Sequence, residues 1–153
     1  MERHDLLDRY RDGFSAVEQA LDGITDDGLD RPGPEGGWSA RQVAHHLADS
    51  EARAYVRLRR LIAEDEPEIL GYDEPEYARR LHYDRPIETS LGVLRAVRAA
   101  SLELLEALTP DEWERTGTHS ESGSYSVDDW LRIYAEHSHD HAAQIRSARE
   151  GGG

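Results

Sequence analysis

The chain has 153 residues, 18 of them basic and 32 acidic, so its formal net charge is −14 with histidine neutral. This charge repels phosphate backbones and anionic lipid headgroups, which argues against nucleic acid or a membrane surface as a partner. The chain has no cysteine, which excludes disulfides, thiolate metal sites and a cysteine nucleophile. A charged N-terminus and the lack of any apolar run of about 18 residues predict a cytoplasmic protein.

Apolar residues recur at steps of three and four near the N-terminus, as they do on one face of a helix. This stripe predicts a first helix over Asp5–Gly23. The stretch Asp26–Gly37 holds four glycines and two prolines, so we expect a loop there. Ser39 and Gln42 form a capping-box pair, which predicts a second helix that ends before Pro67.

The rest of the chain predicts two more long helices. The pattern weakens over Glu68–Pro86, where we expect a long connection with one short helix capped by Asp73. A clean apolar stripe then follows and stops at Thr109-Pro110. After an irregular stretch, Ser126 and Asp129 open a fourth helix.

Four amphipathic helices with no strand-like alternation of useful length predict an all-α bundle. The length suits one domain, which we place at residues 1–150. The three glycines at 151–153 are expected to form a disordered tail.

Five of the eight histidines lie in the second and fourth predicted helices. At about 100° per residue, His46 lies close to the apolar stripe of the second helix, whereas His45 points toward water. His137 and His141 share the inner edge of the fourth helix, and His139 lies on its other side. Each of these assignments follows from the apolar stripe that packs into the bundle.

Two imidazoles at i and i+4, joined by a third from a facing helix, can converge on one cation. His46, His137 and His141 meet this requirement, and three imidazoles leave positions open for water or substrate. One divalent ion is therefore expected, zinc or nickel first and iron or manganese also compatible. The alternative is that these are core histidines with ordinary hydrogen bonds.

Three segments resemble the DinB/YfiT-like superfamily of metal-binding four-helix bundles, and the resemblance is closest to its YfiT branch. They are Trp38–Ser50, with its His-Leu pair, Gly71–Glu74, and Tyr134–His137 followed by His141. The resemblance implies an up-down-down-up bundle, commonly a homodimer, with His46, His137 and His141 as the metal ligands. The chain departs from the family at Asp140 and Gln144, where a further histidine is often found.

The resemblance implies a metal-dependent enzyme of one of two kinds. One is an S-transferase that joins a small thiol, such as bacillithiol, mycothiol or glutathione, to an electrophilic substrate. The other is a hydrolase that uses water. A non-enzymatic, stress-associated dimer that only binds metal is the alternative from another class, and a scaffold that keeps the ligands without metal is a third.

Other side chains near the predicted ligands are candidates for contacts with the metal ligands or the substrate. Asp49 and Arg53 follow His46 along one edge of the second helix, where they either reach the site or form a surface ion pair. Gln144 follows His141 and could hydrogen-bond a ligand or a substrate, or be exposed. Trp38 and Tyr72 either line the pocket mouth or hold their loops onto the core.

Overall fold

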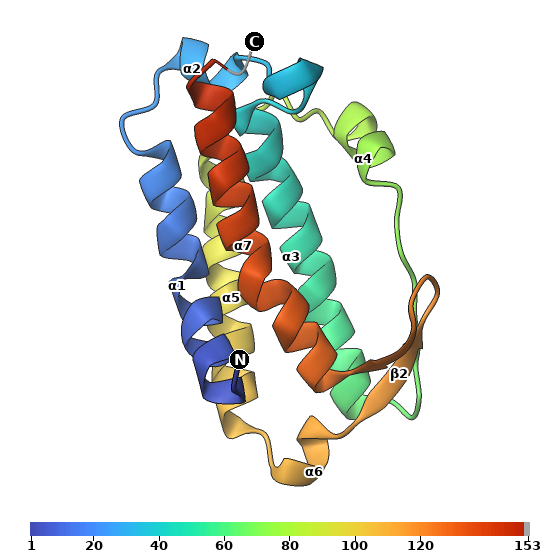
Figure 1. The fold of residues 1–153 in the computed structure, drawn as a ribbon. Coiled ribbons are helices and arrows are strands. Elements are labelled where there is room, and N and C mark those ends of the chain that lie inside the picture. Colours follow the sequence, from blue (N-terminus) through green and yellow to red (C-terminus); the bar gives the residue numbers. More distant parts are fainter. Residues whose placement is uncertain (152–153) are drawn as a thin grey trace.

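The computed structural model describes residues 1–151 and confirms the predicted helical bundle (Figure 1). The first and last long helices run in one direction and the two middle ones in the other, which is the expected up-down-down-up order (Figure 1). Within the described residues the long helices are α1 (Arg3–Leu21), α3 (Ala40–Ala63), α5 (Glu88–Ala107) and α7 (Val127–Arg149).

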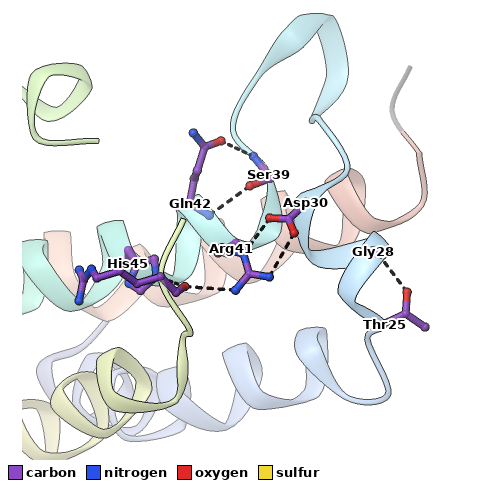
Figure 2. A network of polar contacts seen from close by, with 8 residues as sticks. Thr25, Gly28, Asp30, Ser39, Arg41, Gln42 and His45 are labelled. Atoms are coloured by element: carbon purple, nitrogen blue, oxygen red, sulfur yellow. Dashed lines mark hydrogen bonds and ion pairs between the residues drawn. The ribbon is translucent and has the colours of Figure 1, made fainter. Parts of the chain in front are cut away.

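The connection between α1 and α3 is more ordered than the predicted loop. It contains the short helices α2 (Asp26–Asp30) and η1 (Pro34–Gly36). The Thr25 hydroxyl accepts a hydrogen bond from the backbone of Gly28, and this cap begins α2. Arg41 donates to Asp30 over 2.7 Å, which ties α2 to the start of α3 (Figure 2).

The predicted capping box at the start of α3 is present. The Ser39 hydroxyl accepts from the Gln42 backbone, and the Gln42 side chain accepts from the Ser39 backbone (Figure 2). These two bonds satisfy N–H groups that a helix start otherwise leaves unpaired. They fix the register of α3, and with it the direction in which His46 points.

A long crossover carries the chain from the end of α3 back to the start of α5 (Figure 1). It contains β1 (Glu68–Ile69) and α4 (Glu74–Arg80), and Asp73 caps α4 as predicted by accepting from the Glu76 backbone. After α5 come α6 (Pro110–Trp113), β2 (Thr116–His119) and β3 (Gly123–Ser126).

The sequence predicted no strands, and the structure corrects this. In the described part of the chain β1 pairs in parallel with β2, and β2 pairs antiparallel with β3. The strands have only two to four residues, too few to show an alternating pattern. Position 117 in β2 requires glycine, because a Cβ there would collide with the Pro67 carbonyl.

A buried ion pair crosses the middle of the bundle. Arg98 on α5 donates to Glu51 on α3 and to the backbone carbonyl of Tyr10 on α1, and these two charged side chains are almost fully buried. Its guanidinium also lies 3.9 Å from the centre of the Tyr10 ring. Gly13 leaves the room, since a Cβ there would collide with the Arg98 guanidinium. We call Tyr10, Glu51 and Arg98 the ion-pair layer.

None of the helices within residues 1–151 is both long and apolar enough to cross a membrane. Of the predicted glycine tail, Gly151 forms a turn whose N–H donates to the Ala148 carbonyl. Gly152 and Gly153 lie outside the described residues.

Candidate metal centre

The structure brings His46, His137 and His141 together at the contact between α3 and α7. One ring nitrogen from each imidazole lies within 4.8 Å of one from each of the others. The ring centres are 4.5 Å apart for His137 and His141, and 4.7 Å apart for His46 and His141. The i, i+4 spacing on α7 and the inward register of α3 produce this arrangement.

Burial keeps these imidazoles neutral. Loss of solvation lowers the pKa of His46 to about 3 and that of His137 to about 3, and neighbouring imidazoles add to both shifts. Burial also lowers the pKa of His141, opposed by its hydrogen bond to Gln144. At neutral pH all three therefore offer lone pairs, which is the form that binds a metal.

Two of the three imidazoles have one buried nitrogen without a hydrogen-bond partner in the described part of the chain. Within the described residues, the buried Nδ1 atoms of His46 and His137 have none. Nδ1 of His141 lies 2.6 Å from Oε1 of Gln144, so it donates its proton there and leaves Nε2 with a lone pair. Unpaired buried nitrogens are costly unless a ligand completes them, so this set of donors fits a divalent cation.

His45 shows what a hydrogen-bonded core histidine looks like in this chain. It is fully buried, with Nδ1 2.7 Å from the Ser90 hydroxyl and Nε2 2.8 Å from the Arg85 carbonyl. The prediction that His45 faces water is therefore wrong. The crossover and α5 cover that side of α3. A helical wheel considers only the residues of α3 itself and so cannot predict this cover.

A cavity of about 440 Å³ borders the metal centre at His137. Its wall includes His137 together with Ser50, Arg57, Tyr72, Glu74 and Tyr134. Oε2 of Glu74 lies 3.9 Å from Nε2 of His46, so a carboxylate stands at the edge of the centre. The volume is that of a site for a small molecule.

Sequence reasoning missed Arg57 and Glu74 as members of this cavity. Arg57 follows His46 by eleven residues, about three helical turns, so the wheel used for the histidines also places Arg57 on that face. Glu74 ends the segment Gly71–Glu74 that carries part of the resemblance. Its approach to His46 depends on the path of the crossover, for which the sequence holds no simple signal.

Asp49 and Arg53 do not pair with each other. Asp49 accepts a hydrogen bond of 2.7 Å from the Tyr83 hydroxyl. The Arg53 guanidinium lies 4.4 Å from the centre of the Tyr72 ring and donates to the Tyr77 hydroxyl over 3.1 Å. Both side chains thus hold the crossover against α3, next to the site.

The two aromatic residues singled out in the sequence flank the centre. The Trp38 ring is 4.9 Å from the His46 ring, and the Tyr72 ring packs edge-on against Tyr77 at 4.7 Å. Trp38 therefore shields one side of His46 from water. Tyr72 lies in the cavity wall, where its buried hydroxyl has no hydrogen-bond partner among the described residues.

Comparison with known proteins agrees with this architecture. Residues 9–145 match the family model described as the DinB superfamily. A protein of Oceanobacillus iheyensis named "Putative metal-dependent hydrolase" is 44% identical over 124 residues, which cover 81% of this chain and 72% of that protein.

Two solved structures are also similar. YfiT from Bacillus subtilis, described as "a probable metal-dependent hydrolase with an unusual four-helix bundle topology", superimposes with a TM-score of 0.90 and 28% identity, covering 98% of this chain and 89% of that one. A mycothiol-dependent maleylpyruvate isomerase gives a TM-score of 0.78 at 11% identity, covering 96% and 62%. At that identity the second likeness concerns the fold alone.

Proposed function

We propose a function for this chain, which belongs to the DinB superfamily: it is a metal-dependent enzyme that binds its metal ion through His46, His137 and His141. The observation that carries the proposal is the set of three converging neutral imidazoles, two of which have buried nitrogens without partners. A buried polar cluster left incomplete by its own chain is suited to a ligand.

A divalent ion held by these imidazoles, zinc or nickel before iron or manganese, would act as a Lewis acid that lowers the pKa of a thiol or of water. Residues of the chain would orient one ligand, shield another and form the cavity for the substrate. Gln144 fixes the ring of His141 and the position of its proton. Trp38 packs against His46, and the cavity lined by His137 and Glu74 admits a small molecule.

The reaction we propose is transfer of a low-molecular-weight thiol, of the bacillithiol or mycothiol kind, to an electrophilic carbon. The chain has no cysteine, so a nucleophilic sulfur has to come from a cosubstrate. The cavity has room for a small thiol next to His137. The mycothiol dependence in the name of the isomerase with the same fold also supports this choice.

Hydrolysis is the second candidate, and one contact favours it. The Glu74 carboxylate, 3.9 Å from Nε2 of His46, stands where a group that orients an attacking water is needed. The names of the relatives also refer to hydrolysis. A thiol needs no such carboxylate, so the two reactions make different demands on Glu74.

The first experiment is elemental analysis of protein purified without a histidine tag. We expect about one metal per chain in the wild type and a loss in His137→Ala. His139→Ala is the matched control, because His139 lies on the same helix but its Nε2 donates to the Arg9 carbonyl. Absence of metal under every loading condition would overturn the proposal and leave a helical scaffold.

The second experiment separates the remaining possibilities. Metal-loaded protein is mixed with a model electrophile with and without a small thiol, and thioether and hydrolysis products are measured separately. Thioether formation that needs both thiol and metal supports thiol transfer, whereas product formed with water alone supports hydrolysis. Metal binding without either product supports the non-enzymatic alternative. The proposed homodimer is checked by light scattering of the same samples.

A further inference from the structure

Arg57 places a positive charge in the wall of the cavity beside the metal centre. It lies on α3, three helical turns after His46, and it shares the cavity with His137. Among the described residues that line this cavity, it is the only lysine or arginine. Histidines apart, it is therefore the cavity's one cationic side chain.

The Arg57 guanidinium is held in place from two sides. Nη1 donates to the Tyr134 hydroxyl over 3.0 Å, and Nη2 donates to the Leu70 carbonyl in the crossover. A guanidinium has five N–H groups, so these bonds leave most of its donors free. The Tyr134 ring packs edge-on against His137 at 5.7 Å, so Arg57 has a fixed position relative to the metal centre.

The charge of Arg57 is not neutralised by the chain. Within residues 1–151 it forms no ion pair, although the sequence has 32 acidic residues. Arg60, one turn further along α3, forms an ion pair with Glu64 at 3.0 Å. A fixed, unpaired guanidinium at a cavity wall is the usual means of binding a carboxylate.

The remaining charges in the cavity wall limit where an anionic group can bind. Asp73, Glu74 and Glu121 also line it, and Glu74 is near His46 rather than in contact with Arg57. Asp73 is engaged in capping α4. An anion is therefore attracted at Arg57 and repelled elsewhere in the wall, which favours a ligand that places a carboxylate at Arg57.

We propose that Arg57 binds a carboxylate of the thiol that enters this cavity, at the end of the molecule away from its sulfur. The inference rests on the proposed function, because the sulfur end is assigned to the metal centre. It adds a substrate class, thiols that carry a carboxylate, and it names Arg57 as the residue that selects them.

Matched pairs of simple thiols test this proposal. Cobalt-loaded protein is titrated with 3-mercaptopropionate and 6-mercaptohexanoate and with the alcohols of the same length, and the cobalt absorption spectrum reports thiol binding. We expect the wild type to prefer the carboxylate over the alcohol by about tenfold for at least one length, the effect of one charge-assisted hydrogen-bonded contact. Arg57→Gln should lose this preference, and Arg60→Gln should keep it.

The neutral thiols make the result interpretable. Their affinity should stay unchanged in Arg57→Gln, which shows that the variant keeps its fold and its metal. Equal affinities of carboxylate and alcohol in the wild type would overturn the inference while leaving thiol binding intact, and so would a preference that survives in Arg57→Gln. If not even the neutral thiols bind the cobalt protein, thiol transfer itself fails, and this inference fails with it.

Discussion

The bundle buries two groups of ionisable side chains, about one and a half helical turns apart on α3, and the two groups differ in how their charges are balanced. In the ion-pair layer, Arg98 meets Glu51 and the carbonyl of Tyr10, so opposite charges balance within the chain. In the metal centre, three imidazoles of the same kind face one another, and two of them have nitrogens without partners.

Because of this difference, we assign the ion-pair layer to stabilising the fold and the metal centre to binding a ligand. The ion-pair layer joins α1, α3 and α5 by pairing opposite charges within the chain, although the Tyr10 hydroxyl, Oε2 of Glu51 and Nε of Arg98 have no hydrogen-bond partner within the described residues. The metal centre holds three neutral imidazoles, and the Glu74 carboxylate lies only at its edge, 3.9 Å from Nε2 of His46. The two groups also interact, because the positive charge of Arg98 contributes, after burial and the neighbouring imidazoles, to the lowered pKa of His137.

The largest effect is expected from breaking the ion-pair layer. Arg98→Met leaves Glu51 buried without its partner, which should lower the free energy of unfolding by about 3–5 kcal/mol. Urea unfolding in the presence of a chelator measures this without a contribution from metal. The double variant Glu51→Leu/Arg98→Met should recover much of the loss. A loss below about 1 kcal/mol in the single variant would show that the layer does not hold the fold.

A bound metal ion should stabilise the protein through the metal centre alone. A ligand that binds only the folded state adds about 2.7 kcal/mol at a hundred times its dissociation constant. We therefore expect zinc to raise the melting temperature of the wild type and of His139→Ala, and to leave that of His141→Ala unchanged. Calorimetry with zinc and with chelator gives both values. Equal stabilisation of His141→Ala would place the bound ion elsewhere.

The pH dependence of the metal-free protein sharpens the comparison. His46 and His137 have a pKa of about 3 in the folded state against 6.5 in the unfolded chain, so the unfolded state takes up protons first as the pH falls. Their contribution to stability is therefore complete above about pH 6.5 and is lost toward pH 3. Between pH 6.5 and 5.5 the titration of His46 and His137 together should lower the free energy of unfolding by roughly 2 kcal/mol.

Urea unfolding at several pH values checks this expectation. His46→Gln should remove about half of the dependence, because it leaves His137 as the other strongly shifted histidine. His139→Ala should leave the slope unchanged. A metal-free protein whose stability is constant from pH 7 to 5 would mean that the imidazoles are solvated in the folded state.

The features that could be predicted from the sequence are those that depend on helical periodicity. Helical periodicity was sufficient for the long helices and for the inward direction of His46, His137 and His141, because these features depend on contacts among the bundle helices. It failed for His45, since the crossover buries a side of α3 that the wheel assigns to water. Burial by a segment without periodicity leaves no pattern in the sequence.

The ion-pair layer was not predicted for a related reason. Glu51 and Arg98 are 47 residues apart, and each is a charged residue of a kind common on helix surfaces. Only the packing of α3 against α5 shows that they face each other. The small residue that admits the guanidinium, Gly13, lies on a third helix. A pair that depends on three helices at once has no local signal.

The smallest effect concerns the hydrogen bond between Gln144 and His141 at the metal centre. Gln144 accepts from Nδ1 of His141 at 2.6 Å and so orients that imidazole. Gln144→Ala should weaken zinc binding by about tenfold, the lower end of the effect of losing such a partner. Gln144→Glu keeps an acceptor and adds charge, so it should bind zinc at least as tightly as the wild type. Competition with a chromogenic chelator measures the affinities, and unchanged binding in Gln144→Ala would show that α7 alone orients His141.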